Sequence, residues 1–125
     1  MKIFYGKYEF NTEKINFVDV NNVFVGYSTD TDCCEYADWF ISDKESNEII
    51  ERVEELDELP DYIFDVDYFE EVTGTSELDM GGMVRFRLVN GDSEKFLHLF
   101  NCHNGYYGHG FSFGVNETLL REGCL

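Results

Sequence analysis

Apolar and polar residues alternate along much of this chain. Val23, Val25 and Tyr27 are separated by polar or small neighbours, and the stretch from Glu35 to Ser42 has the length of a short strand. Successive side chains of a strand point to opposite faces of its sheet, so a period of two is typical of a strand with one buried face. We therefore predict that the first thirty residues form strands and turns, and that residues 35–42 form another short strand.

One segment has helical periodicity instead. Ser42 and Glu45 match a capping box, in which a hydroxyl and a carboxylate satisfy backbone N–H groups at the start of a helix. Pro60 would end this helix. Its apolar face would consist of Ile49, Val53, Leu56 and Leu59. A second face would carry a stripe of four carboxylates, Glu48, Glu51, Glu55 and Glu58. The pattern predicts one acidic amphipathic helix.

Alternation returns between Asp61 and Val72, which we predict to be a single strand. Its inward row would be Tyr62, Phe64, Val66 and Tyr68. Its outward row would hold the carboxylates of Asp61, Asp65 and Asp67. Asp65 and Asp67 would then lie on the same face, about 7 Å apart, because each residue of a strand adds about 3.3 Å.

The last third of the chain predicts a meander of strands. Val84, Phe86 and Leu88 alternate with outward residues, Asn90-Gly91 is a hairpin signal, and the segment from Phe96 to His103 returns. Asn104-Gly105 is a second turn signal. A last strand would line one face with Tyr107, His109, Phe111, Phe113 and Val115. Its other face is nearly bare, because it consists of Tyr106, Gly108, Gly110, Ser112 and Gly114. Such a row predicts close approach of an aromatic ring, a helix or a partner.

These elements predict an α+β fold, with a mainly antiparallel sheet of five or six strands and one acidic amphipathic helix. The 125 residues have the length of a single domain, residues 1–125. Hydrophobic residues make up 43% of the chain and aromatic residues 17%. A disordered acidic tail lacks such aromatics, so we expect a folded core.

Charge is distributed unevenly. The net charge is −17, and residues 30–79 hold nineteen carboxylates against only Lys44 and Arg52. The rest of the chain is neutral, with seven acids and seven bases. A contiguous acidic segment creates a directional field that attracts basic partners and repels nucleic acid. The alternative is an acidic surface that serves solubility alone.

Cysteine usage indicates a reducing compartment. An adjacent pair, Cys33 and Cys34, with two distant residues, Cys102 and Cys124, is not the spacing of a secreted disulfide framework. No apolar run has the length of a signal peptide or a membrane span. We therefore expect a cytoplasmic protein with no membrane contact.

Paired carboxylates and a set of cysteine and histidine residues are the candidates for a metal or catalytic site. Asp30-Thr31-Asp32 and Asp65-Val66-Asp67 offer paired oxygens, but neither continues into a calcium loop. A zinc site would use Cys33, Cys34, Cys102 and His103, although the usual Cys-x-x-Cys spacing is absent. A cysteine nucleophile needs a lowered thiol pKa, which an acidic environment opposes. We therefore predict no catalytic residue, no metal and no cofactor.

Two short motifs resemble an uncharacterised family of small phage and prophage proteins. The first is Asp32-Cys33-Cys34-Glu35, and the second is Asn101-Cys102-His103-Asn104-Gly105-Tyr106-Tyr107. The resemblance spans roughly residues 22–115, and it departs in the acidic segment around Pro60. It implies an origin in a phage or mobile element, and it supplies no catalytic residues.

Small, acidic, phage-like chains without a catalytic motif are typical of inhibitors of host defence, such as anti-CRISPR and anti-restriction proteins. We therefore expect a non-enzymatic, DNA-mimic-like protein that blocks a basic nucleic-acid-binding surface of a host protein. Its binding residues would be the carboxylates Glu48, Glu51, Glu55, Glu58, Asp65 and Asp67, with Tyr62, Tyr68, Tyr106 and Tyr107 as aromatic anchors wherever these are exposed.

Two other functions stay open at this point. The first is a small metal-stabilised or enzymatic domain that uses the cysteine–histidine cluster. The second is a structural phage protein that self-associates, for example as a homodimer, through an open sheet edge or the glycine-lined face.

Overall fold

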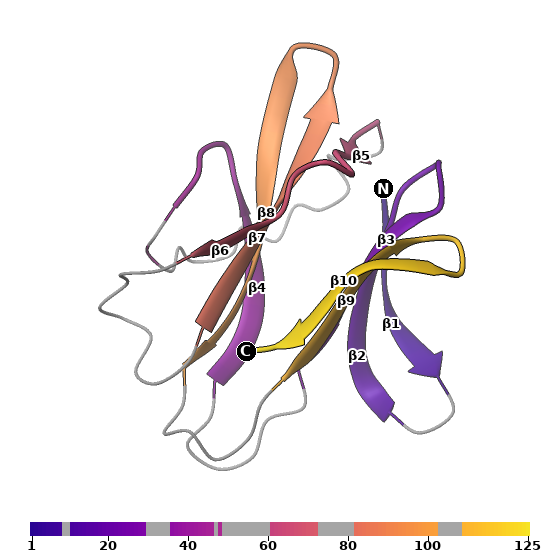
Figure 1. Cartoon of the computed structure of the whole chain (residues 1–125), viewed down its shortest axis with the longest axis vertical. Coiled ribbons are helices and arrows are strands. Elements are labelled where there is room, and N and C mark those ends of the chain that lie inside the picture. The colour runs from indigo at the N-terminus through magenta and orange to yellow at the C-terminus, as the bar shows by residue number, and fades with distance from the viewer. Residues whose placement is uncertain (9–10, 30–35, 47, 49–60, 73–81, 103–108) are drawn as a thin grey trace.

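The computed structural model describes residues 1–8, 11–29, 36–46, 48, 61–72, 82–102 and 109–125. Two antiparallel sheets pack face to face as a sandwich, and Figure 1 shows them as two layers. The strands are β1 (Lys2–Tyr8), β2 (Asn11–Val18), β3 (Val23–Ser28), β4 (Tyr36–Ser42), β5 (Ile63–Phe64), β6 (Glu70–Val72), β7 (Gly82–Asn90), β8 (Ser93–Cys102), β9 (Gly110–Val115) and β10 (Thr118–Cys124).

Each sheet has five strands. We name them sheet A, with the order β1-β2-β3-β9-β10, and sheet B, with the order β4-β8-β7-β5, in which β6 also pairs with β7. Every strand pair is antiparallel. The chain therefore crosses between the sheets twice, after β3 and after β8.

The expected alternation places apolar residues between the sheets. Val25, Tyr27 and Phe113 come from sheet A, and Phe86 and Leu99 come from sheet B. Phe17 of β2 meets Trp39 of β4 edge to face, with ring centroids 4.9 Å apart. The Tyr27 hydroxyl donates to the Phe100 carbonyl oxygen of sheet B at 2.8 Å, which satisfies a buried polar group and joins the layers.

A buried carboxylate makes a second link between the layers. Asp19 follows β2, and its Oδ1 accepts the backbone N–H groups of Asn21 and Val23 at 2.9 and 3.0 Å. Its Oδ2 accepts the backbone N–H of Phe64 in β5 at 2.8 Å. The same side chain therefore shapes the β2–β3 turn and attaches it to sheet B.

The predicted α+β fold class is wrong. The described residues contain ten strands in two sheets and no helix, so within them the fold is all-β. The predicted count of five or six strands missed the strands β1, β2 and β10 as separate elements. Short strands with few apolar residues, such as Thr118–Cys124, carry little periodic signal because their side chains are mostly exposed.

The start predicted for the acidic helix is also wrong. Ser42 pairs with Phe96 as the last residue of β4, and its hydroxyl donates to the Lys44 carbonyl oxygen. The Glu45 carboxylate contacts Arg85 and Tyr68 rather than a backbone N–H group. Tertiary contacts thus replace the capping box. The rest of the predicted helix, residues 49–60, lies outside the described residues.

The segment 61–72 is two short strands rather than one. β5 and β6 both pair with β7, and a turn lies between them in which the Tyr68 N–H donates to the Asp65 carbonyl oxygen at 3.2 Å. Tyr62 and Phe64 are buried as expected, whereas Val66 lies exposed in the turn. The expected common face of Asp65 and Asp67 is therefore lost.

Gly91 lies in a turn and Gly114 lies against an aromatic ring. The β7–β8 turn places Gly91 and Asp92 between Asn90 and Ser93, so Gly91, with a φ of 58°, is the first residue of the turn and Asn90 still belongs to β7. On β9, a Cβ at Gly114 would lie 3.0 Å from the ring of Phe24. The bare face of the last strand therefore accommodates an aromatic ring of the same chain at that position. Tyr106, Tyr107 and Gly108 lie outside the described residues.

Candidate functional site: the acidic sheet and its buried arginine

Charge divides between the two sheets. Among the described residues, the segments that form sheet B (36–46, 48, 61–72 and 82–102) hold eleven carboxylates and four lysines or arginines, which leaves seven negative charges. The segments that form sheet A (1–8, 11–29 and 109–125) hold four of each. We call these parts the acidic half and the neutral half. Within the described residues, the excess negative charge therefore lies on the segments that form sheet B.

A row of four residues crosses the outer face of sheet B. Glu70 of β6 lies opposite Arg85 of β7, Arg85 opposite His98 of β8, and His98 opposite Phe40 of β4. The rings of His98 and Phe40 are stacked, with centroids 4.2 Å apart and planes 9° apart. Arg85, His98 and Phe40 are all buried, so this outer face is covered rather than open to water.

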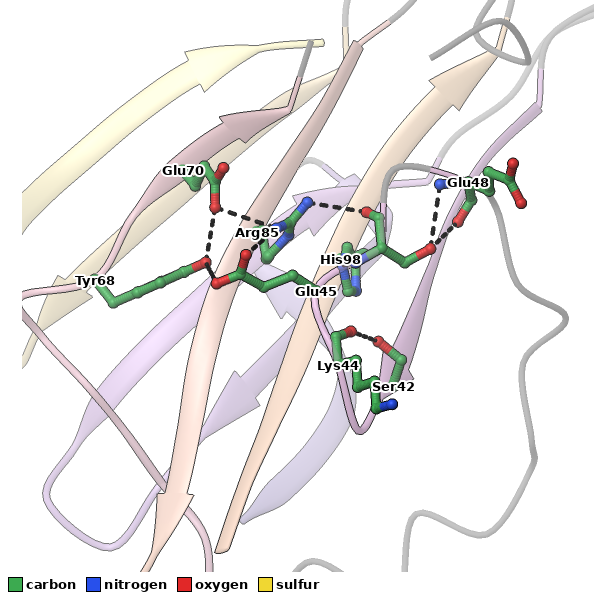
Figure 2. A network of polar contacts seen from close by, with 9 residues as sticks. Ser42, Lys44, Glu45, Glu48, Tyr68, Glu70, Arg85 and His98 are labelled. Carbon is green, nitrogen blue, oxygen red and sulfur yellow. Dashed lines mark hydrogen bonds and ion pairs between the residues drawn. The ribbon is translucent and has the colours of Figure 1, made fainter. Parts of the chain in front are cut away.

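Arg85 is the centre of the network drawn in Figure 2. Only 1% of its surface is exposed. Its Nη1 lies 3.2 Å from a carboxylate oxygen of both Glu45 and Glu70, and its Nη2 donates to the Ser46 carbonyl oxygen at 3.0 Å. A buried guanidinium requires such anionic and carbonyl partners, because removing it from water without them costs several kcal/mol. The network therefore holds residues 45 and 46 against sheet B.

Tyr68 contacts both carboxylates that pair with Arg85. Its hydroxyl lies 3.1 Å from Glu45 Oε1 and 2.8 Å from Glu70 Oε2, and it donates to one of them at a time. Burial, followed by these two hydrogen bonds, raises the pKa of Tyr68 above its usual range. The two carboxylates are thus bridged by a neutral hydroxyl on one side and by a guanidinium on the other.

His98 is a neutral member of the same face. Its Nε2 accepts the backbone N–H of Ser46 at 3.3 Å, so the ring proton lies on Nδ1. Burial and the nearby Arg85 charge lower the pKa of His98 to about 4. Because the ring has no exposed surface, we assign it a packing role and not that of a general base.

Two more cations neutralise carboxylates of the acidic half. Arg87 lies 3.0 Å from Asp65 and 2.8 Å from Glu94, and hydrogen bonds to Glu94 and then Asp65 raise its pKa. Lys95 pairs with Asp43, and this hydrogen bond lowers the pKa of Asp43. Five carboxylates are therefore committed to cations of the same chain.

Five exposed carboxylates of the acidic half stand outside the ion pairs that the described residues make with one another. They are Glu48, Asp61, Asp67, Glu71 and Asp92. Their side chains are exposed to solvent, whereas Asp65 is paired with Arg87. We call them the open carboxylates.

The structure places five of the ten predicted binding residues. Glu48 and Asp67 are exposed, and Asp65 is half-buried in its pair with Arg87. Tyr62 is only 8% exposed, so it does not meet the requirement that an aromatic anchor be exposed. The Tyr68 hydroxyl is hydrogen-bonded to Glu45 and Glu70. Glu51, Glu55, Glu58, Tyr106 and Tyr107 lie outside the described residues.

The cysteine–histidine cluster is placed only in part. Cys102 is half-buried at the end of β8, while Cys33, Cys34 and His103 lie outside the described residues. Within the described part of the chain, no group of three or more His, Cys, Asp or Glu side chains is arranged to hold a metal ion. The zinc and calcium alternatives gain no support from the residues that are placed.

Sequence reasoning missed Arg85 and Glu45. Arg85 alternates correctly as an outward residue of its strand, and no local signal shows that this outward face is covered. Glu45 was interpreted as a cap because Ser42 stands three residues before it. A signal was present in the composition around Arg85, because β7 carries two arginines among mainly apolar residues, and a cation requires a partner if it is buried.

Comparison with protein-family models, with curated proteins and with solved structures gave no match. The resemblance of the two motifs to a phage family therefore stays a prediction. The described residues contain no helix of the length and apolarity that crossing a membrane would require.

Proposed function

We propose that this chain is a non-enzymatic binding protein that covers a basic, nucleic-acid-binding surface of a host protein. The observation that carries the proposal is the charge difference between the two halves of one sandwich. A field that leaves one side of a small protein orients it toward a basic partner and speeds their association. The bacterial cytoplasm is the compartment in which we expect this to happen, as for inhibitors of CRISPR or restriction systems.

The open carboxylates are the groups that would meet the partner. Glu48, Asp61, Asp67, Glu71 and Asp92 are exposed and can each accept hydrogen bonds from arginine or lysine. Duplex DNA carries about one negative charge per 1.7 Å of its axis, and a groove built for that charge density attracts a surface rich in carboxylates. Of the residues predicted from the sequence, Glu48 and Asp67 fit this role.

The committed carboxylates have a different role in the proposal. Glu45, Glu70 and Asp65 are held in place by Arg85 and Arg87, so they contribute shape and a fixed orientation more than free charge. An interface built on fixed groups loses less conformational entropy when it binds. The buried network thus prepares the surface on which the open carboxylates stand.

Affinity capture from a bacterial lysate tests the proposal. The bait is wild-type protein or the triple variant Glu48→Gln, Asp61→Asn and Asp67→Asn, at low and at moderate salt. We expect wild type to retain one dominant nucleic-acid-binding protein, and duplex DNA to displace it. The triple variant should bind about tenfold more weakly at low salt, with a smaller difference at moderate salt, because exposed charges are screened.

A pair of single variants supplies the matched control. Asp67→Asn removes one exposed carboxylate from the acidic half, and Glu122→Gln removes one from the neutral half. Only the first should weaken retention. Retention that neither the triple variant nor duplex DNA reduces would contradict the proposal, and so would a mixture of basic proteins that is lost at moderate salt.

A further inference from the structure

Three turns meet at one end of the sandwich. Asp19, in the β2–β3 turn, accepts the N–H of Phe64, which precedes the turn at residues 65–67. The carbonyl oxygen of Asn22, in the same β2–β3 turn, accepts the N–H of Asn116 in the β9–β10 turn at 3.0 Å. Figure 1 shows these turns on the same side of the drawing, near β5. Both sheets therefore contribute to this end.

Exposed apolar side chains lie on these turns or directly after them. The large hydrophobic residues that are exposed within the described part of the chain are Val20 (77%), Leu119 (51%), Val66 (46%) and Leu120 (42%). Val20 lies in the first turn, Val66 in the second, and Leu119 and Leu120 begin the strand that follows the third. We call these four residues the apolar end. Single exposed apolar residues are common, but four on or directly after three adjoining turns point to a binding surface.

The backbone beneath the apolar end is well fixed. The buried Asp19 carboxylate accepts two N–H groups of its own turn. Asn22 and Asn116 have φ values of 60° and 54°, a conformation that asparagine tolerates and that closes tight turns. Apolar side chains on a fixed turn lose little entropy on binding, so they serve well as anchors.

Charge at the apolar end comes mainly from the acidic half. Asp65 and Asp67 flank Val66 directly, and Asp61 lies just before β5. Glu117, in the β9–β10 turn, is exposed as well, and the exposed cation Arg121 follows Leu120 directly, with its guanidinium over the Phe69 ring. The ion pair with Arg87 holds Asp65 in place beside Val66. Apolar groups bordered by carboxylates fit a partner whose apolar side chains are bordered by arginine or lysine.

We propose that the apolar end is the docking surface for the basic partner, and that it binds a segment in which apolar side chains alternate with arginine or lysine. Val20, Val66 and Leu119 supply the contact area, and the neighbouring carboxylates of the acidic half bind the cations. The inference rests on the proposed function and names where that function is carried out. It adds an apolar contribution that charge alone would not provide.

Two labelled peptides test this docking surface. In the first, arginine alternates with leucine; in the second, arginine alternates with serine, so both carry the same charge. Fluorescence anisotropy gives their affinities for wild type, for the variant Val20→Thr, Val66→Thr and Leu119→Thr, and for the triple charge variant described above. Each threonine replaces an exposed apolar side chain without changing any charge, and an unchanged melting temperature shows that the variant is folded.

We expect wild type to bind the arginine–leucine peptide about tenfold more tightly than the arginine–serine peptide. The threonine variant should bind both peptides equally, and Val66→Leu should bind like wild type. If the threonine variant keeps the preference for leucine while the charge variant loses affinity, the docking surface is wrong and the proposed function stands. If the charge variant binds both peptides as wild type does, the proposed function fails as well.

A second copy of the chain is the alternative occupant. Sedimentation of wild type and of the threonine variant distinguishes it from the basic partner. A wild-type dimer that the threonine substitutions convert to a monomer would overturn the proposal, because the apolar end would then be a self-association surface.

Discussion

The two halves of the sandwich stabilise buried charge in opposite ways. In the neutral half, the Asp19 carboxylate is surrounded by three backbone N–H groups and no cation of the described residues pairs with it. In the acidic half, Arg85 is buried between two carboxylates and a carbonyl oxygen. A carboxylate can be satisfied by the backbone of a turn, whereas a guanidinium has five N–H donors and needs several acceptors, which come here from β6 and from residues 45 and 46 after β4. Asp19 holds the β2–β3 turn against sheet B, and Arg85 holds residues 45 and 46 against the same sheet.

The same comparison explains how the acidic half tolerates its charge. Arg85, Arg87 and Lys95 lie among its carboxylates and commit five of them to ion pairs. The neutral half has no such excess to balance. The acidic half therefore combines a network of five carboxylates and three cations with a set of open carboxylates that face solvent.

Removing the anionic partners of Arg85 should have the largest effect. The double variant Glu45→Gln and Glu70→Gln leaves a buried guanidinium without a carboxylate, and we expect it to lower the free energy of unfolding by about 3 kcal/mol. Urea denaturation measures this loss. Adding Arg85→Met to the double variant should restore most of the stability, because the uncompensated charge is then gone. A triple variant less stable than the double would show that Arg85 acts through packing alone.

Acid should destabilise the acidic half through His98. Its pKa is lowered to about 4 in the folded chain, against about 6.5 when unfolded, so the unfolded chain binds a proton first as the pH falls. The contribution of His98 to the free energy of unfolding should be fully present above pH 6.5. It should decline between pH 6.5 and 4, by up to about 3 kcal/mol. Urea denaturation across this range, with wild type compared with His98→Gln, checks the effect. The glutamine variant can still accept the Ser46 N–H and should show a weaker dependence on pH.

The neutral half should depend on Asp19 to a smaller extent. Asp19→Asn replaces a carboxylate that accepts three N–H groups with an amide, whose NH2 group then faces a backbone N–H donor. We expect the free energy of unfolding to fall by about 2 kcal/mol. The exposed Asp61→Asn is the matched control and should change stability by less than about 0.5 kcal/mol. Chemical denaturation of both variants makes the comparison. Equal effects at the two positions would mean that the hydrogen bonds of Asp19 contribute little.

The smallest expected effect concerns the open carboxylates. Asp67→Asn should raise the free energy of unfolding by a few tenths of a kcal/mol at low salt, because it relieves repulsion within the acidic half. Glu122→Gln in the neutral half should leave it unchanged. The gain at Asp67 should vanish at high salt, where screening shortens the range of exposed charges. A gain that persists in salt would point to a local cause rather than to repulsion.

The sequence by itself determined the strands whose apolar residues alternate, because period two has the same meaning wherever the sheet lies. It also determined which part of the chain is acidic. At Gly114 it left a ring, a helix or a partner open, and the structure places the Phe24 ring there. It misled at Ser42 and Glu45, where a local capping pattern is used instead for a long-range ion pair.

Only the tertiary structure decided which charges are open. Asp65 and Asp67 are equivalent in the alternation, yet Arg87 of another strand pairs with Asp65 and leaves Asp67 exposed. Likewise, Val66 continues an apolar row in the sequence but lies exposed, because the strand breaks into β5 and β6. The physical reason is that burial depends on which residues of distant strands become neighbours, and local periodicity carries no information about those neighbours.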